Sequence, residues 1–137
     1  SFIFFKNKTK VNHFIVYMRM ECKVTSFMQD LNSLKVENLQ KWFNEESKIW
    51  IPPMKEILGA GRILALFRAI FKRYENIEWK ASEIFDLGNN KFFYETISLG
   101  NMKGKGEYSN QICTVVSFTE NGKITFLSDY FKDTCMF

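Results

Sequence analysis

The sequence predicts an α+β domain in which helices come first and a long antiparallel sheet follows. Three observations support this prediction. Apolar residues recur at helical spacing in the first half of the chain, they alternate with polar residues after Asn76, and an Asn-Gly pair separates the last two strand candidates. Because 137 residues make about one domain, the helices should pack on one face of a single, strongly curved sheet.

Two helices are expected at the start of this domain. Apolar residues three and four positions apart draw one stripe over residues 20–31 and a second over residues 34–43. Asn32 or Ser33 is expected to cap the second helix, since these side chains accept hydrogen bonds from the N–H groups of a first turn.

A short strand and a third helix should follow. Residues 48–51 favour a strand that Pro52-Pro53 ends, because proline cannot donate to a β-ladder. Gly59-Ala60-Gly61 is interpreted as a helix-entry turn, since no Lys-Ser/Thr pair follows it as in a phosphate-binding loop. One side of the third helix should be apolar, formed by Ile63, Phe67, Ile70, Phe71 and Tyr74.

Four strands are expected in the second half, where the apolar pattern has a period of two. Asn121-Gly122 is a strong hairpin signal, and a glycine-rich loop with Gly100, Gly104 and Gly106 is expected between the second and third of these strands. The predicted strands cover residues 77–87, 91–99, 108–119 and 123–132.

Composition and charge narrow the class of protein. Apolar residues make up 46% of the chain, which includes 15 Phe, and no apolar run approaches the length of a membrane span, so a soluble protein is expected. The three cysteines are odd in number and widely separated, which favours a reduced, cytoplasmic compartment. The net charge of +4 lies within residues 1–25, so the domain itself is expected to have no basic face for nucleic acid. Residues 1–17 are interpreted as an extension, arm or tag, and residues 18–137 as the domain.

The chain offers few groups for metal or nucleophilic chemistry. Cys22, Cys113 and Cys135 lack the paired spacing of a metal or redox site, and His13 is the single histidine. We therefore expect no metal and no cofactor, and acid–base chemistry must come from carboxylates, tyrosines or lysines.

The order of these features resembles the SnoaL-like branch of the nuclear transport factor 2-like superfamily over about residues 20–133. The resemblance lies in the two leading helices, Trp50-Ile51-Pro52-Pro53, the Gly59-x-x-x-Ile63 helix start, and Gly122-Lys123-Ile124 followed by Asp129-Tyr130-Phe131. It implies a cone of curved sheet closed by helices, usually dimeric through the outer face of the sheet. It also implies a small-molecule pocket, since the superfamily includes polyketide cyclases, ketosteroid isomerases and limonene-epoxide hydrolases.

The strand around Asp129 looks like the one that carries a catalytic aspartate in the limonene-epoxide hydrolases. The other charged and polar positions of that family are not matched. Its Tyr and Asn fall near Ile49 and Ile51, and its Arg and second Asp fall near Thr96 and Ser98. Epoxide opening needs a base on the water and an acid on the epoxide oxygen, and Asp129 alone supplies one of these.

Asp129 is the principal candidate for catalysis. It stands between Leu127 and Phe131, so strand alternation places its carboxyl on an apolar face. Burial there would raise its pKa, which suits a group that transfers protons. The position also suits a structural aspartate that is hydrogen-bonded to a Tyr, a Ser or a backbone amide, and both interpretations stay open.

Tyr94 or Tyr108 is predicted to donate a hydrogen bond to oxygen charge that develops on a substrate. Glu95 should point away from the cavity, on the opposite face from Tyr94. The other candidates suit a ligand site, but also an aromatic core or cross-strand pairs; they are Trp50, Ile51, Phe67, Phe71, Thr96, Ser98, Asn110 and Phe131.

Two function classes remain open. The chain is either an enzyme that acts on a small apolar compound by carboxylate-assisted proton transfer, of the isomerase, cyclase or hydrolase type, or a noncatalytic module that binds an apolar ligand or a protein partner. A homodimer is expected through the outer face of the sheet, where small uncharged side chains gather on one strand: Ser109, Gln111, Cys113, Val115 and Ser117.

Overall fold

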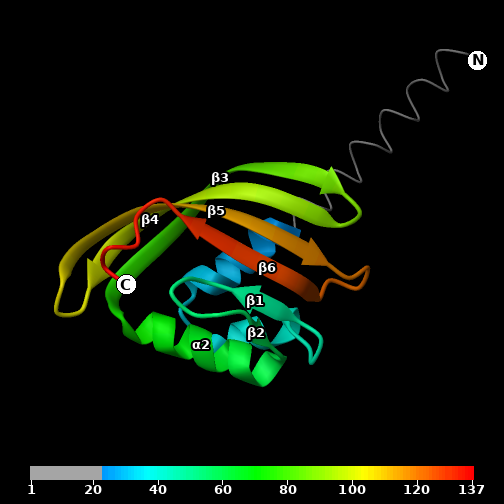
Figure 1. Ribbon diagram of the computed structural model, residues 1–137, viewed down its shortest axis with the longest axis horizontal. Helices are drawn as coiled ribbons and strands as arrows, with labels where there is room; N and C mark the ends of the chain where they lie inside the picture. Colours follow the sequence, from blue (N-terminus) through cyan, green and yellow to red (C-terminus); the bar gives the residue numbers. More distant parts are fainter. Residues whose placement is uncertain (1–22) are drawn as a thin grey trace, which may run out of the picture.

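A curved sheet of six strands arches over the first helix, and α2 (Ala60–Lys72) lies across its open side (Figure 1). The computed structural model describes residues 23–137, so the predicted extension, His13 and Cys22 lie outside the described residues. In chain order the elements are a first helix over residues 23–32, the 3-10 helix η1 (Val36–Trp42), β1 (Lys48–Trp50), β2 (Ile57–Leu58), α2 (Ala60–Lys72), β3 (Tyr74–Gly88), β4 (Lys91–Met102), β5 (Gly106–Phe118) and β6 (Ile124–Phe131). The predicted α+β class is confirmed.

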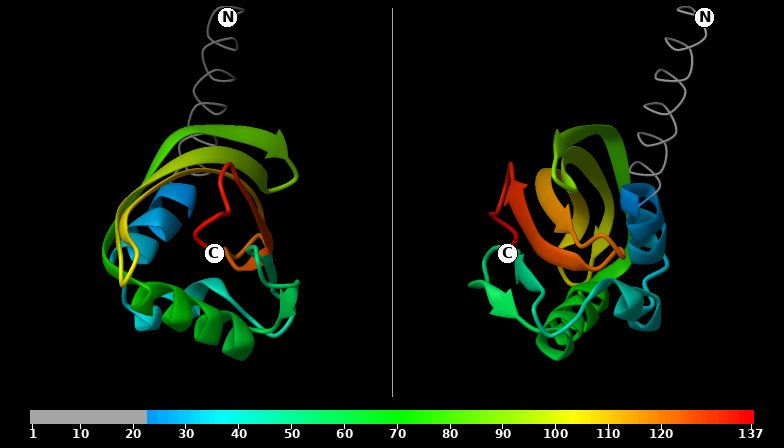
Figure 2. Two further views of the ribbon diagram at one scale, coloured as in Figure 1. Left: turned by 60° about the vertical axis from the view of Figure 1, so that its left-hand side comes forward. Right: turned by 90° about the vertical axis from the view of Figure 1, so that its right-hand side faces the viewer.

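The strands follow the order β2-β1-β6-β5-β4-β3 across the sheet. β3 to β6 form an antiparallel meander, and β1 pairs in parallel with β6, placing Ile49 beside Leu127. Figure 2 shows the long strands arched over the first helix, with α2 at the open end of the arch. The sheet is not closed into a barrel, so its concave face is where a ligand can be enclosed between sheet and helices.

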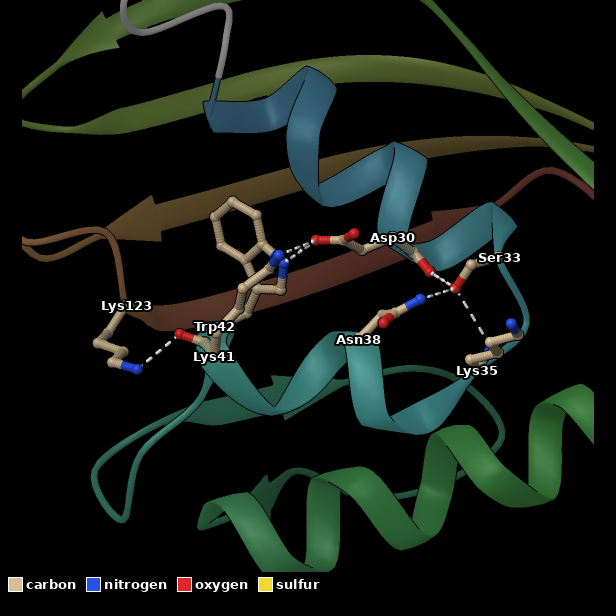
Figure 3. Close-up of polar contacts among 7 residues, drawn as sticks. All are labelled: Asp30, Ser33, Lys35, Asn38, Lys41, Trp42 and Lys123. Carbon is tan, nitrogen blue, oxygen red and sulfur yellow. Dashed lines mark hydrogen bonds and ion pairs between the residues drawn. The ribbon is translucent and has the colours of Figure 1, made fainter.

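Asp30 joins the first helix to η1 (Figure 3). Its Oδ2 accepts a 2.8 Å hydrogen bond from Nε1 of Trp42 and lies 3.2 Å from Nζ of Lys41. The ring of Phe27 in the first helix also packs edge-on against the ring of Trp42, with their centroids 5.6 Å apart. The two helices therefore form one cover over the interior.

The predicted cap of the second helix is confirmed in part: the hydroxyl of Ser33 accepts a 3.3 Å hydrogen bond from the backbone N–H of Lys35, at the start of η1 (Figure 3). Lys35 occupies the N-cap position of η1 and makes no side-chain cap hydrogen bond. Asn32 instead pairs with the backbone of Trp79 in β3, accepting from its N–H at 2.8 Å and donating to its carbonyl at 2.9 Å. Asn32 therefore fastens the first helix to β3 through both polar atoms of its side-chain amide.

Gly59 provides the predicted entry into α2. Its φ of 93° lies in a region that favours glycine, and its N–H donates a 2.8 Å hydrogen bond to the carbonyl of Ser47. The helix buries Ile63 and Phe67 against the core. Tyr74, which the sequence placed on this helix, is the first residue of β3, because α2 ends at Lys72.

Gly100 lies inside β4 and not in the loop that the sequence predicted there. A Cβ at this position would lie 2.2 Å from the carbonyl oxygen of Asn76 and 2.8 Å from Cα of Ile77. The pairing of β3 with β4 shifts register between Tyr74 and Asn76, which brings the two backbones together at this point. Glycine is therefore required by close backbone approach, and the strand continues to Met102.

The hairpin predicted at Asn121-Gly122 is confirmed. β5 and β6 pair antiparallel, and Gly122 donates its N–H to the carbonyl of Thr119 at 3.0 Å with a φ of 89°. The register set by this turn places Thr114 beside Asp129. Within residues 23–137, no helix combines the length and the apolar character needed to cross a bilayer.

Candidate functional site

A cavity of about 60 Å³ lies between the concave face of the sheet and the helices. This volume has room for a few water molecules and is smaller than the roughly 150 Å³ cavity that admits benzene in an engineered protein, so a larger ligand requires wall side chains to move. Most of the wall is apolar, and the lining residues are Phe27, Met28, Leu31, Ile51, Pro52, Phe67, Ile70, Arg73, Tyr74, Trp79, Tyr94, Thr96, Tyr108, Ile112, Thr114, Leu127, Asp129, Phe131 and Phe137.

Three side chains from adjacent strands form a row on the polar wall of this cavity. The register pairs Tyr94 of β4 with Thr114 of β5, and Thr114 with Asp129 of β6. The Oγ1 of Thr114 donates a 2.6 Å hydrogen bond to Oδ1 of Asp129. Tyr94 is 2% exposed and Thr114 is 3% exposed, while Asp129 is half-buried. Strand pairing therefore holds a carboxyl, a hydroxyl and a phenol together.

The surroundings of Asp129 favour its protonated form. Burial raises the pKa of its carboxyl from 3.8 to about 7, and the hydrogen bond from Thr114 opposes that rise. Burial also raises the pKa of Tyr94, with the negative charge of Asp129 adding to the effect and the Thr114 hydroxyl opposing it. Near neutral pH, Asp129 can therefore gain or lose a proton while Tyr94 keeps its own.

Thr96 adds a hydroxyl to the same wall. It is 3% exposed, lines the cavity, and its Oγ1 has no hydrogen-bond partner among the described residues. An unpartnered buried hydroxyl costs free energy of folding, of order 1–3 kcal/mol. Thr96 is therefore a candidate to bind a polar group of a ligand.

Tyr108 and Tyr74 form the polar part of the other end of the cavity. Their ring centroids are 5.4 Å apart, and Nδ2 of Asn110 donates a 3.0 Å hydrogen bond to the hydroxyl of Tyr108. Burial raises the pKa of Tyr108, against the effect of the Asn110 and Tyr74 side chains. Burial also raises the pKa of Tyr74, whose hydroxyl donates to that of Tyr108. Both phenols therefore stay protonated at neutral pH, and, within residues 23–137, the O–H of Tyr108 is free to donate to a ligand.

The C-terminal segment packs over this end. The Oδ1 of Asn110 accepts a 3.1 Å hydrogen bond from the backbone N–H of Asp133, and the Asn110 amide donates to the Asp133 carbonyl. Beyond this contact the ring of Phe137 lies 4.8 Å from that of Phe131 and 6.4 Å from that of Tyr108. Phe137 thereby becomes part of the cavity wall.

The structure brings most of the sequence-predicted candidates to this cavity. Both tyrosines and Asp129 line it, as do four of the predicted ligand contacts: Ile51, Phe67, Thr96 and Phe131. Their roles remain predictions.

The other four predicted ligand contacts do not line the cavity. Trp50 is 46% exposed because β1 turns its neighbour Ile49 inward, which places Trp50 on the opposite face. Phe71 packs behind the wall, with its ring 6.2 Å from that of Trp79. Ser98 is buried, and its hydroxyl has no hydrogen-bond partner among the described residues. Asn110 forms hydrogen bonds with the Tyr108 hydroxyl and with the backbone of Asp133 in the C-terminal segment.

Sequence reasoning missed several lining residues that come from distant parts of the chain. Trp79 and Tyr74 belong to β3, Arg73 follows the end of α2, and Phe137 returns from the end of β6. The alternation of β3 could have indicated Trp79, whereas no sequence pattern indicates that Arg73 and Phe137 line the same cavity. Over residues 23–137, no group of three or more His, Cys, Asp or Glu side chains is arranged to hold a metal ion.

No model of a protein family matches the sequence, and no curated protein matches it either. Solved structures show clear similarity. A nuclear transport factor 2-like (NTF2-like) protein of unknown function from Exiguobacterium sp. 255-15 has a TM-score of 0.72 and 14% identity, over 82% of this chain and 99% of the other. A putative SnoaL-like polyketide cyclase from Shewanella denitrificans OS-217 has a TM-score of 0.71 and 14% identity, over 82% and 90%.

An LEH-like epoxide hydrolase from M. tuberculosis is also similar, with a TM-score of 0.67 and 20% identity, over 80% of each chain. At such identities the similarity defines the fold and not the reaction. The chain therefore has the NTF2-like fold found in SnoaL-like cyclases and in epoxide hydrolase-like and ketosteroid isomerase-like proteins. The fold predicted by resemblance is confirmed.

Proposed function

We propose that this chain is a small-molecule-pocket protein of the SnoaL-like type that catalyses proton transfer on a small apolar compound, with Asp129 as the base. The observation that carries the proposal is a carboxyl whose pKa is raised to about 7 in the wall of a mostly apolar cavity. A general base works best when its pKa lies near the working pH. A similar structure described as a putative SnoaL-like polyketide cyclase supports a small-molecule reaction in this pocket.

Each side chain of the polar wall has a role in this proposal. Ionised Asp129 takes a proton from a carbon next to a carbonyl group and returns it at a second position. Tyr94, which keeps its proton, donates a hydrogen bond to the negative charge that develops on the carbonyl oxygen. Thr114 orients the carboxyl through its 2.6 Å hydrogen bond.

Tyr94 suits the role of hydrogen-bond donor better than Tyr108. Tyr94 lies in the same row of the sheet as Asp129. Tyr108 is six residues along β5 from Thr114 and pairs with Gly100, so it lies outside this row. Proton transfer is favoured over epoxide opening because Asp129 is the one carboxyl among the lining residues of the described chain, and epoxide opening needs a separate acid and base.

Deuterium exchange tests the proposal without knowledge of the natural substrate. 2-Tetralone, a small apolar ketone with acidic α-protons, is incubated with the protein in D₂O and followed by proton NMR. The wild-type protein should accelerate exchange above buffer, and the rate should rise with pH to about 7 and then level off, because the base must be ionised. Asp129→Asn should reduce the enzymatic rate by about 10²-fold or more.

Asp86→Asn is the matched control, since Asp86 is an exposed carboxyl on β3 and should leave the rate unchanged. Tyr94→Phe should lower the rate while retaining its pH profile, since it removes a hydrogen-bond donor and not the base. Equal exchange by wild type and Asp129→Asn would refute the catalytic role of Asp129.

A noncatalytic binding module is the second candidate, and the small volume of the cavity favours it. Phe27, Phe67, Phe131 and Phe137 all contribute to the lining, so that about 60 Å³ is left between them. Binding of 2-tetralone without any exchange by the wild-type protein would support this alternative over the enzyme.

A further inference from the structure

Arg73 is the one cationic side chain among the cavity-lining residues of the described chain. It directly follows α2 and is half-buried. Among residues 23–137 its guanidinium forms no ion pair within 4.0 Å, and it takes part in no hydrogen bond through its side chain. The mechanism proposed for Asp129 does not use this group.

Two phenols stand beside Arg73. Tyr74 follows it in the chain and is 8% exposed, and Tyr108, whose ring is 5.4 Å from that of Tyr74, is 4% exposed. Burial raises the pKa of Tyr74, Tyr108 adds to the rise, and the positive charge of Arg73 opposes it. Arg73 and both tyrosines line the same cavity. A planar guanidinium with neutral O–H donors around it has the chemistry of a carboxylate site.

The acidic groups nearby do not occupy this site. Glu75 and Glu107 are exposed and adjoin Tyr74 and Tyr108 in their strands, so alternation turns them to the opposite face of the sheet. Asp133 is also exposed, and its carboxylate accepts a hydrogen bond from the N–H of Cys135. The charge of Arg73 is therefore available to a ligand inside the cavity.

The two ends of the cavity differ in chemistry. Tyr94 and Asp129 lie in one row of the sheet with Thr96 close by on β4, whereas Tyr74 and Tyr108 lie farther along the strands, opposite Met102 and Gly100 of β4, and Arg73 precedes Tyr74. Phe67 and Trp79 contribute apolar wall. Asp129 and Arg73 make no ion pair with each other within 4.0 Å. A ligand that is complementary to both groups of side chains has an apolar body, with a negatively charged group that contacts Arg73 and a reactive polar group that contacts Asp129.

We propose that the ligand is a small apolar carboxylic acid whose carboxylate binds Arg73, with the Tyr108 hydroxyl as a further donor. This inference rests on the proposed function in placing the reacting part of the same ligand at Asp129. A single negative charge matches one guanidinium. A phosphate monoester carries close to two, which would leave an unpaired charge in a half-buried site.

Titration calorimetry with matched probes tests this inference. The ω-phenylalkanoates from phenylacetate to 6-phenylhexanoate are compared with their neutral primary amides at about pH 6, where Asp129 is largely protonated and repels an anion least. The wild-type protein should bind the carboxylate of the best-fitting length at least about tenfold more tightly than its amide, and the neutral phenyl end should make the same contacts in both.

Arg73→Gln should lose this preference, binding the carboxylate about tenfold more weakly and the amide with unchanged affinity. Arg73→Lys should retain part of it, since lysine keeps the charge without the planar fork. Arg68→Gln is the matched control, because Arg68 is an exposed arginine in the helix that Arg73 follows. The preference of this variant for the carboxylate should equal that of the wild type.

The outcomes separate this inference from the proposed function. Equal affinity of acid and amide, or a preference that persists in Arg73→Gln, would overturn the carboxylate site and leave the role of Asp129 standing. A carboxylate preference that depends on Arg73, together with no deuterium exchange, would support the site and refute catalysis. If neither probe series binds the wild-type protein, the carboxylate site is overturned as well.

Discussion

Thr114 and Asp129 lie opposite each other on β5 and β6, and the threonine hydroxyl donates a 2.6 Å hydrogen bond to the carboxyl. This bond stabilises the ionised form of Asp129, while burial destabilises it. The two effects have opposite sign, and the pKa of about 7 shows that burial is the larger. Removing either effect should shift the pKa in a direction that can be measured.

Thr114→Val should raise the pKa of Asp129 above about 7, because valine keeps the shape of threonine but cannot donate a hydrogen bond. Carbon-13 NMR titration of the Asp129 carboxyl measures this shift. Thr125→Val is the control: Thr125 is exposed on β6, and its hydroxyl bonds to the carbonyl of Ser117. An unchanged pKa in Thr114→Val would show that the hydrogen bond does not affect the ionisation.

The stability of the wild-type protein should contain a pH-dependent contribution from Asp129. Unfolded Asp129 ionises near pH 3.8 and the folded group near pH 7, so between these values the folded state binds the extra proton. The free energy of unfolding should therefore fall as pH rises from about 4 to 7, by at most about 4 kcal/mol from this group, and then level off.

Asp129→Asn should remove that contribution, so that the variant is more stable than the wild type at about pH 8 and the difference between them shrinks toward about pH 4. Urea unfolding of both proteins across this pH range measures the difference in their free energies of unfolding. The contributions of the other carboxyl groups cancel in this difference, because both proteins contain them. A difference that stays constant with pH would mean that the folded and unfolded pKa values of Asp129 are equal.

The sequence could predict most of the polar wall, because strand alternation is a local property. Leu127 and Phe131 on either side of Asp129 correctly placed its carboxyl on the cavity face, and the same rule placed Tyr94 and Thr96 there. Trp50 and Ile51 were both predicted to reach the ligand. They are consecutive residues, and Ile51 lines the cavity while Trp50 is 46% exposed.

The features of the fold and of the site that the sequence could not predict depend on contacts between segments that are distant in the chain. β2 contains two residues, Ile57 and Leu58, too few for any pattern to reveal, and its pairing with β1 forms only in the folded sheet. Gly100 resembled a loop residue because the approach of Asn76 is set by a register shift in β3. Arg73 lines the cavity, but it is charged and lies just after the end of a helix, so neither helical nor strand periodicity could predict its position.

Gly100→Ala should destabilise the protein by about 1–3 kcal/mol, because the added Cβ would lie 2.2 Å from the carbonyl oxygen of Asn76 and the strands must separate. Gly61→Ala is the matched control. Gly61 lies in α2 with nothing within 4 Å of a Cβ, so alanine should be neutral or stabilise by up to about 1 kcal/mol. Chemical unfolding compares the two, and equal stabilities would contradict the close approach of β3 to β4.

A homodimer through the outer face of the sheet remains a prediction. Val115 of β5 pairs with Phe93 of β4, which pairs with the 46% exposed Phe85 of β3, so the register aligns an apolar row on that face. Sedimentation equilibrium should detect a dimer, and Val115→Glu should convert it to a monomer by burying an unpaired charge. Leu58→Glu, an exposed site on β2, should leave the dimer intact.

Phe137 should limit the size of the ligand that the cavity admits. Its ring lies 4.8 Å from Phe131 and 6.4 Å from Tyr108 and contributes to the wall of a cavity of about 60 Å³. Phe137→Ala should therefore enlarge the cavity, bind 6-phenylhexanoate at least about fivefold more tightly, and lower the free energy of unfolding by about 1–2 kcal/mol, since a half-buried ring is lost.

Met136→Ala provides the control for this change, because Met136 is half-buried beside Phe137 but does not line the cavity. It should reduce stability without tightening the binding of 6-phenylhexanoate. If Phe137→Ala instead weakens binding of every phenylalkanoate, the ring is a surface on which the ligand packs. The 60 Å³ cavity would then have to expand elsewhere, with Phe67 and Ile70 of α2 as the remaining movable wall.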